Sequence, residues 1–155
     1  MGAMPLLTLL AAWALASERS CLPEFAYRGG WLGADAAYSA ALPEGRLLWL
    51  FGDTFVGSET AETRSGAAMV ANSVAVSTCG PGGFEAGYAW RRAADGKPAP
   101  FFDTGDPKVR YWPLDAIVEG GVAYVFLTRI RATGQGPLDF ASEGADVARL
   151  SLGPG

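Results

Sequence analysis

Two aspartates, Asp35 and Asp53, have the residue type and the spacing for acid–base chemistry on a sugar. Facing or diagonal positions on paired strands lie about 4.5 to 8 Å apart, a range that includes the carboxylate separations of both retaining and inverting glycosidases. In an apolar, aromatic setting the pKa values of two such carboxyl groups are pushed apart, which provides one acid and one base near neutral pH. The alternative is that each aspartate only stabilises its own turn, since both follow glycines closely.

A predicted hairpin brings the two aspartates together. Its strands run from Ala36 to Leu42 and from Leu47 to Phe55, and the turn between them is Pro43-Glu44-Gly45-Arg46. A short loop with a glycine between two runs of β-forming residues is typical of a hairpin. Either of the two registers that this turn allows places residue 35 opposite residue 53 or 54, so the aspartates are neighbours in both.

Aromatic residues flank the acids. Their rings stack on the apolar C–H faces of sugars, and a carboxylate beside such a ring can bind hydroxyl groups. Trp49 and Phe51 lie in a strand interior, where aromatic side chains most often pack in the core. Trp31 and Trp112 stand at strand entrances and are the better surface candidates, and Tyr38 lies beside the acid pair.

Further polar residues are candidates for the lining of a pocket. Asn72 interrupts an apolar strand, so it either lines a pocket or marks a β-bulge or an outward-facing position. Asp115 follows the Tyr111-Trp112 pair and is a candidate for binding sugar hydroxyls. Asp103, Asp106 and Asp115 could join a calcium site, but they lack the spacing of a calcium loop, so no cofactor is predicted and calcium stays an alternative without a motif.

The composition excludes several kinds of function. The 155 residues contain no histidine, which removes catalytic triads that need an imidazole and zinc sites with histidine ligands. The net charge is −4, and the 12 Lys and Arg residues form no basic stripe, so nucleic acid is not an expected partner. No phosphate-binding, dinucleotide-binding, serine-hydrolase or zinc-protease motif occurs.

The chain is predicted to be an all-β domain. Its 21 glycines and 10 prolines, against 18% charged residues, are typical of a turn-rich β protein. Apolar runs of strand length alternate with turn clusters, and no long helical period occurs between them. Beyond the first hairpin we expect a strand or a strand pair at Ala68 to Thr78. We expect further strands at Phe84 to Arg91, Arg110 to Glu119, Val122 to Ile130 and Val147 to Leu152, with loops at Arg92 to Gly105 and Gln135 to Gly144.

Two predicted hairpins resemble each other. Trp49-Leu50-Phe51 aligns with Tyr124-Val125-Phe126 at an offset of 124 − 49 = 75 residues, and each hairpin opens with an Asp-Ala pair, at Asp35 and Asp115. A repeat of strand-rich units favours a β-propeller, whose blades take roughly 40 to 50 residues. The length provides about three blades, so we expect an incomplete propeller with four-stranded blades in an open arc. A small β-sandwich is the alternative.

The N-terminus carries a candidate secretion signal. Pro5 to Ala16 is an apolar run that ends in Ala-Leu-Ala, like a signal-peptidase site, and it is too short to span a membrane. Residues 1–16 are therefore predicted to be a signal peptide, and residues 17–155 a secreted or periplasmic domain. A buried helix is the alternative, because no Lys or Arg precedes the run. Cys21 and Cys79 could form one disulfide, and the sequence leaves this pairing open.

Three segments carry a resemblance to a known family. The stretch from Gly30 to Gly57, GWLGADAAYSAALPEGRLLWLFGDTFVG, resembles the opening blade of a bacterial family of secreted, five-bladed β-propeller glycoside hydrolases. That family includes endo-D-arabinanases acting on mycobacterial cell-wall arabinan. Met69 to Val76 and Tyr111 to Ile130 are similar to its next blades. The resemblance implies that the chain is the N-terminal portion of a propeller of about five blades.

The resemblance also implies a function and a set of residues. It implies hydrolysis of an arabinan-like polysaccharide, with Asp35 and Asp53 at the acidic active-site positions and Asn72, Trp112 and Asp115 lining the pocket. Ala36 and Ala116 stand where the family often has glycine after the aspartate. Two other interpretations remain: a carbohydrate-binding propeller without catalysis, and a fragment without activity.

Overall fold

The computed structural model describes residues 21–134, 136 and 138–153, so the predicted signal peptide lies outside the described residues. In this part of the chain, helical structure is limited to a 3-10 turn at Pro43–Gly45. The prediction of an all-β domain is confirmed. The strands are β1 (Trp31–Ala34), β2 (Tyr38–Ala41), β3 (Leu47–Phe51), β4 (Thr54–Val56), β5 (Ala68–Val70), β6 (Ser73–Gly80), β7 (Gly83–Ala89), β8 (Arg91–Arg92), β9 (Pro98–Ala99), β10 (Val109–Glu119), β11 (Val122–Ala132) and β12 (Phe140–Ser151).

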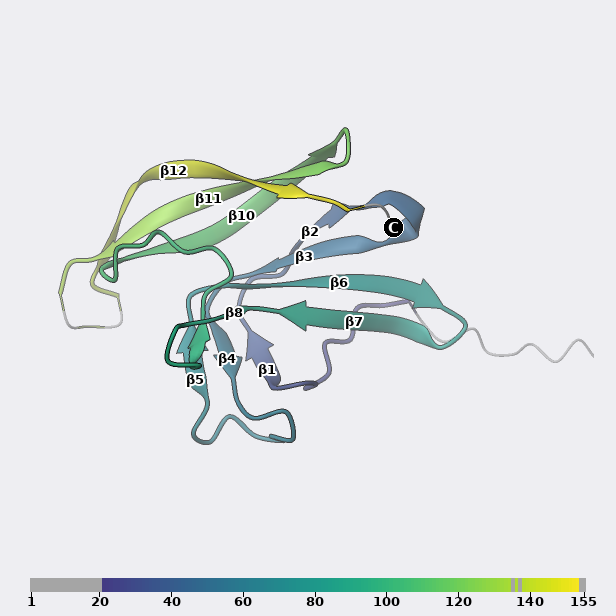
Figure 1. Ribbon diagram of the computed structural model, residues 1–155, viewed down its shortest axis with the longest axis horizontal. Coiled ribbons are helices and arrows are strands. Elements are labelled where there is room, and N and C mark those ends of the chain that lie inside the picture. Colours follow the sequence, from purple (N-terminus) through teal and green to yellow (C-terminus); the bar gives the residue numbers. More distant parts are fainter. Residues whose placement is uncertain (1–20, 135, 137, 154–155) are drawn as a thin grey trace, which may run out of the picture.

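Two antiparallel sheets form the body of the molecule (Figure 1). The first sheet has the strand order β2-β3-β6-β7, and the second has the order β10-β11-β12. Strand β10 packs against β2 and β3, so the first strands of the two sheets are neighbours in space. Both predicted hairpins are confirmed: Ala41 pairs with Leu47 in the first, and Glu119 pairs with Val122 in the second.

The hydrophobic core between the two sheets follows from the two-residue period of the strands. In β11 the side chains of Ala123, Val125 and Leu127 point to one face and are buried, while Phe126 points to the other and is exposed. From the first sheet Leu42, Leu48, Leu50 and Val74 complete this core, with Phe102 from the loop that precedes β10. Leu50 and Val125, which the sequence repeat aligns, are both fully buried in it.

An aromatic cluster covers the opposite face of the first sheet. Trp49 and Phe51 are buried there, as predicted for strand-interior aromatic residues. Phe25 from the N-terminal segment meets the rings of both edge-on, at centroid distances of 4.9 and 5.2 Å. The indole of Trp31 stacks on Tyr88 of β7 at 4.1 Å. The N-terminal segment and β1 are therefore fastened to this sheet by ring contacts.

Two smaller sheets were not among the predicted elements. Strands β1, β4 and β5 form a three-stranded sheet, and β8 pairs with β9 inside the predicted loop. The prediction of one strand from Leu47 to Phe55 is wrong, because the chain leaves the first sheet at Gly52-Asp53 and pairs with β1 instead. The segment Ala68 to Thr78 forms the pair β5 and β6, which was one of its two predicted forms.

The expected blade arrangement also needs correction. The described residues form one four-stranded sheet, two three-stranded sheets and one two-stranded sheet, not three four-stranded blades, and none of them closes into a barrel. Strand β12 begins at Phe140, inside the segment predicted as a loop. Asp115 lies within β10 opposite Phe126, whereas Asp35 precedes β2, so the two aspartates are not in equivalent positions.

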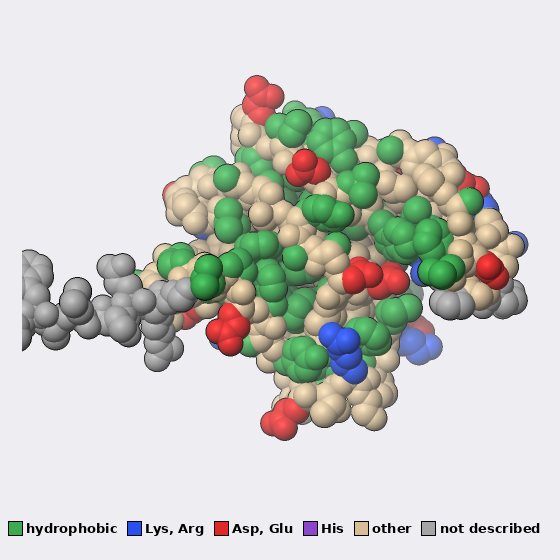
Figure 2. All heavy atoms as spheres, turned by 180° about the vertical axis from the view of Figure 1, so that it is seen from behind, with side chains coloured by type: hydrophobic (Ala, Val, Ile, Leu, Met, Phe, Trp, Pro, Cys, Tyr) green, Lys and Arg blue, Asp and Glu red, His purple; other side chains and the backbone are tan. Residues whose placement is uncertain are grey.

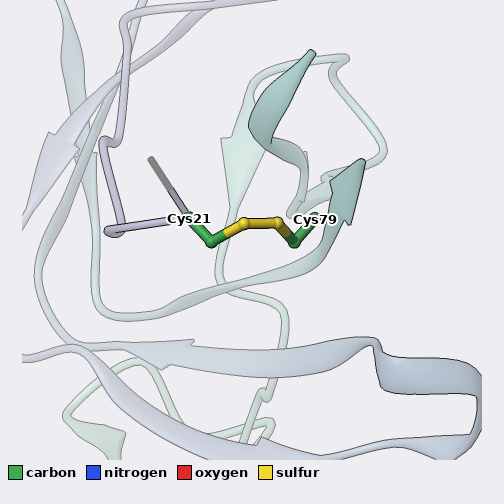
Figure 3. Close-up of a disulfide and its surroundings, with 2 residues drawn as sticks. All are labelled: Cys21 and Cys79. Carbon is green, nitrogen blue, oxygen red and sulfur yellow. A yellow bond between two sulfur atoms is a disulfide. The ribbon is translucent and has the colours of Figure 1, made fainter. Parts of the chain in front are cut away.

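A disulfide joins Cys21 to Cys79 at the end of β6 (Figure 3). Their Cα atoms are 5.7 Å apart, and the bond closes a loop with a sequence separation of 58 residues. A loop of this length restricts the unfolded chain enough to stabilise the fold by about 4 kcal/mol. The bond therefore holds the N-terminal segment, and with it Phe25, against the first sheet.

The molecular surface matches the modest charge of the sequence. On the face shown in Figure 2, hydrophobic, acidic and basic side chains are intermixed, and Lys and Arg form no continuous band. No helix in the part of the chain that the structure describes has the length and the apolar character needed to cross a bilayer.

Candidate active site

A backbone corner at Gly52-Asp53 brings Asp35 and Asp53 together. The N–H of Asp35 donates to the carbonyl of Asp53 at 3.1 Å, and the N–H of Gly52 donates to the carbonyl of Asp35 at 3.1 Å. These two bonds continue the pairing of Ala34 with Thr54. The prediction that the two aspartates are neighbours is confirmed, although the strands that pair are β1 and β4 beside the first hairpin.

Gly52 leaves room for the carboxylate of Asp35. A side chain at position 52 would collide with Oδ1 of Asp35. Ala36, the next residue, has a φ of 55°, in the left-handed region that favours glycine. The backbone after Asp35 therefore takes a conformation that is strained for an alanine.

The carboxyl group of Asp53 is half-buried, and its pKa is raised above the usual value. Burial is the largest cause, because it disfavours the charged form, and the nearby carboxylate of Asp35 adds to it. The indole N–H of Trp112, which donates to Oδ1 at 3.4 Å, and the positive charge of Arg110 act in the opposite direction. Asp53 therefore holds a proton at a higher pH than an exposed aspartate does.

A pocket of about 350 Å³ opens beside Asp53. This volume is within the range of small-ligand sites, about 300 to 1,000 Å³. The ring of Trp112 forms one wall and meets Phe140 edge-on at 4.9 Å. The pocket is lined by Asp53, Met69, Arg110, Trp112, Ile130, Ala132, Gly134, Gly136, Asp139 and Phe140. It thus combines apolar side chains with two carboxyl groups and one guanidinium group.

Sequence reasoning missed Arg110, Asp139 and Phe140 as members of this pocket. The two-residue period of a strand puts Arg110 on the same face as Trp112, so that residue could have been found. Asp139 and Phe140 come from a segment that was predicted to be a loop, and nothing local in the sequence indicates that it lies beside Asp53. One carboxylate oxygen of Asp139 accepts the N–H of Gly136 at 2.7 Å.

The expectation that Trp31 presents a surface for sugar stacking is wrong. Its side chain is 3% exposed, it stacks on Tyr88, and its Nε1–H donates to Oγ of Ser73 at 3.3 Å. The strand entrance at which it stands faces the aromatic cluster of the first sheet. Trp112, the other predicted surface indole, does border the pocket.

Asn72 is fully buried, but its amide is occupied by the backbone of two other segments. Its Nδ2 donates to the carbonyls of Phe102 and Tyr111 at 3.0 and 2.9 Å, and its Oδ1 accepts the N–H of Phe102 at 2.7 Å. Both amide protons are therefore used. Asn72 ties the β5–β6 corner to the loop before β10, in place of the predicted pocket lining, bulge or outward position.

Tyr38 and Asp115 lie at the surface, away from the pocket lining. Tyr38 is 45% exposed in β2. Asp115 is exposed, and its carboxylate accepts the N–H of Ala116 at 2.8 Å. Asp35 is also exposed and is not among the pocket-lining residues, so of Asp35, Asp53 and Asp115 only Asp53 lines this pocket. Their roles toward a substrate stay predictions.

Two other observations limit the choice of site. A pocket of about 460 Å³ lies at strand β7, and its lining includes Arg28, Glu85, Tyr88 and Trp90. Among the described residues that line it, Glu85 is the single carboxylate, whereas the Asp53 pocket has two. The described ranges hold no group of three or more His, Cys, Asp or Glu side chains suited to a metal ion.

A comparison with family models decides the classification. The family described as a domain of unknown function, DUF5005, matches residues 24–154. The chain belongs to this family. No curated protein matches the chain. These results do not confirm membership of the arabinanase family that the sequence resembles.

A solved structure shares the fold of this DUF5005 domain. It is a crystal structure from Bacteroides ovatus, described as a “putative hydrolase”, with a TM-score of 0.59 and 19% sequence identity. The match covers 83% of the present chain and 37% of that protein. The domain therefore corresponds to a little over a third of the length of its structural relative.

Proposed function

We propose that this DUF5005 domain is the N-terminal portion of a glycoside hydrolase in which Asp53 and Asp35 are the catalytic carboxyl groups. The observation that carries the proposal is the setting of Asp53. Its carboxyl group is half-buried, has a raised pKa, lies beside a second aspartate and borders a pocket of about 350 Å³. Glycosidases need one carboxyl group that keeps its proton near neutral pH and a second that is charged.

The environments of the two aspartates suggest their roles. Asp53 is the general acid, because burial helps it to hold the proton that it gives to the glycosidic oxygen. Asp35 is exposed, and its carboxylate either attacks the sugar or activates water. The N–H of Trp112 then stabilises the Asp53 carboxylate that remains after proton transfer.

The pocket lining supports a carbohydrate substrate. The rings of Trp112 and Phe140, with Met69, offer apolar surface to the C–H face of a sugar. Arg110 and Asp139 offer groups that bind hydroxyls. The resemblance to endo-D-arabinanases favours an arabinan-like polysaccharide, and the structural relative described as a hydrolase is in keeping with a hydrolytic reaction.

The strand arrangement supports a propeller as the complete fold. In a propeller each blade is an antiparallel sheet, and the blades surround a common channel. Here two antiparallel sheets follow each other along the chain, and their first strands, β2 and β10, lie side by side. The proposal takes these sheets as two successive blades of a structure that further chain completes.

The disulfide supports secretion. Disulfides persist in oxidising compartments and are rare in the cytosol. The Cys21–Cys79 bond joins the first described residue to the first sheet. Together with the apolar run that precedes it in the sequence, this bond favours a periplasmic or extracellular location.

The test is hydrolysis of purified polysaccharides by the full-length protein. We expect new reducing ends on an arabinan or a related plant or bacterial polysaccharide, and a loss of activity of at least 100-fold in Asp53→Asn, as for removal of a general acid. Asp95→Asn, an exposed loop aspartate paired with Lys97, is the matched control and should keep full activity. Binding of a polysaccharide without hydrolysis would contradict the proposal and favour the second interpretation, a carbohydrate-binding domain.

A further inference from the structure

A chain of buried hydrogen bonds runs beneath the corner that carries Asp53. Nε1–H of Trp31 donates to Oγ of Ser73 at 3.3 Å. The hydroxyls of Ser73 and Thr54 are 2.8 Å apart, and Oγ1 of Thr54 donates to the carbonyl of Gly52 at 2.8 Å. Three strands, β1, β6 and β4, contribute one side chain each.

The direction of every bond in this chain is determined by proton counting. A hydroxyl group has one proton to donate. The proton of Thr54 goes to the carbonyl of Gly52, which can only accept, so Ser73 must be the donor to Thr54. Oγ of Ser73 then accepts from the indole of Trp31, which can only donate. Every hydrogen bond in the series therefore points the same way, from the indole of Trp31 through the two hydroxyls to the carbonyl of Gly52.

The side chains of this hydrogen-bond chain are shielded from water, and its last bond joins the two residues that flank Asp53. Thr54 and Ser73 are fully buried, and Trp31 is 3% exposed. Gly52 precedes Asp53 and Thr54 follows it, so the bond from the Thr54 side chain to the Gly52 carbonyl closes the corner around Asp53. A buried hydroxyl or carbonyl that loses its partner is costly, which makes alternative conformations of this corner unfavourable.

We propose that Ser73 and Thr54 are positioning residues that hold the carboxyl group of Asp53 at the edge of its pocket, next to the indole of Trp112. The catalytic meaning of this role rests on the proposed function of Asp53. The positioning itself concerns the conformation of the corner and can be measured without any substrate.

The same sheet provides a matched control. Nε1–H of Trp49 donates to Oγ of Ser77 at 2.7 Å, and both residues are buried in the first sheet. This pair is also an indole–serine bond between β3 and β6, but Ser77 pairs with Leu47 at the end of β3 away from the corner, whereas Ser73 pairs with Phe51 next to it. Ser73→Ala and Ser77→Ala therefore both remove an indole–serine bond from strand β6, at positions four residues apart, and Ser73→Ala also removes the bond to Thr54.

The indole of Trp112 is a reporter of the Asp53 carboxyl group, because its N–H donates to Oδ1. The charged groups that act on Asp53 are the carboxylate of Asp35 and the guanidinium of Arg110, and Asp139 lines the same pocket. In an NMR pH titration, the indole N–H signal of Trp112 should follow the ionisation of Asp53. Its midpoint then measures how well the corner keeps that carboxyl group partly buried.

The experiment compares this midpoint in the wild type, Ser73→Ala, Thr54→Val, Thr54→Ser and Ser77→Ala. We expect lower midpoints in Ser73→Ala and Thr54→Val, because a loosened corner exposes Asp53 to water and its pKa falls toward the usual value. Thr54→Ser keeps the hydroxyl and should keep the wild-type midpoint, as should Ser77→Ala. Ser77→Ala, which loses one buried hydrogen bond, should lower the melting temperature by about 2 to 8 °C, and Ser73→Ala, which loses two, should lower it more.

Each outcome decides the proposal. An unchanged midpoint in Ser73→Ala and Thr54→Val overturns it, and so does a shift of the same size in Ser77→Ala. If Ser73→Ala does not fold, the comparison of Thr54→Val with Thr54→Ser decides in the same way. If the full-length protein hydrolyses a polysaccharide, Ser73→Ala should lower kcat about 10- to 100-fold at an almost unchanged KM. A shifted midpoint without hydrolysis would uphold the positioning and count only against the proposed function.

Discussion

The indole N–H of Trp112 donates a hydrogen bond to Oδ1 of Asp53 at 3.4 Å. Trp112 belongs to the second sheet, and Asp53 lies 59 residues earlier in the sequence, on the corner where the chain leaves the first sheet. The bond links the two sheets at the candidate site. It also opposes burial, because a donor to the carboxylate favours the ionised form of Asp53. The pKa of Asp53 is therefore set jointly by the two sheets.

Trp112→Phe should raise the pKa of Asp53 further. The substitution removes the N–H donor that lowers this pKa and leaves burial and the Asp35 carboxylate, which both raise it. A titration of the carboxyl carbons by NMR measures the change. Trp90→Phe, at a half-buried indole next to β7, should leave the Asp53 titration unchanged. A fall of the Asp53 pKa in Trp112→Phe would contradict the assigned direction.

Asp53→Asn should stabilise the fold at neutral pH. The folded-state pKa of Asp53 is above its unfolded value of 3.8, so the folded state binds more protons between these two values. The wild type therefore loses stability as pH rises through this window, and the asparagine variant does not. Because the carboxyl group is only half-buried, we expect a gain of less than about 1 kcal/mol.

Urea denaturation of both proteins at several pH values measures this difference. The gain should be present above the folded-state pKa and should shrink as the pH falls toward the unfolded value. A variant that is less stable than the wild type at neutral pH, with a gap that closes in acid, would mean that the ionised carboxylate stabilises the fold.

Asn72→Ala should destabilise the domain strongly. It would leave the N–H and the carbonyl of Phe102 and the carbonyl of Tyr111 without their amide partner in a buried position. We expect a loss of about 2 to 4 kcal/mol in the free energy of unfolding. Thr78→Ala, at an exposed position of β6, should change it by less than about 0.5 kcal/mol. A small effect at Asn72 would show that these backbone groups find other partners.

Gly52→Ala should disturb Asp35 more than the fold. The added methyl group would meet Oδ1 of Asp35 and push that carboxylate away from its place above the corner. We expect about a 10- to 100-fold loss of hydrolytic kcat, with a change of melting temperature of a few degrees. Gly87→Ala is the control, since a Cβ there meets nothing within 4 Å. Full activity in Gly52→Ala would argue against a catalytic role for the present position of Asp35.

Part of this architecture is predictable from local sequence. The two-residue period and the turn Pro43–Gly45 predict the first hairpin, and the hairpin predicts that Asp35 and Asp53 are neighbours. The burial of Trp49 and Phe51 follows from the same period. The period does not reveal the break at Gly52-Asp53, because a turn of two residues inside an apolar run looks like a continuous strand.

The rest depends on contacts between distant segments. The position of Trp31 at a strand entrance does not tell which side of the sheet its ring faces, and the ring of Tyr88 is what covers it. Asn72 finds its partners at Phe102 and Tyr111, about 30 and 39 residues further along. Asp139 joins the pocket only because β12 pairs with β11. Single-sequence patterns carry no information on such long-range pairings.

In the proposed mechanism, Asp53 gives a proton to a glycosidic oxygen. The most direct test of this step is the pH dependence of kcat/KM for polysaccharide hydrolysis by the full-length protein, with wild type and Asp53→Asn side by side. We expect that activity in the wild type falls as pH rises through a pKa above the usual aspartate range, and that Asp53→Asn has lost this activity at every pH. An Asp53→Asn protein with the wild-type rate and the same pH profile would contradict this mechanism.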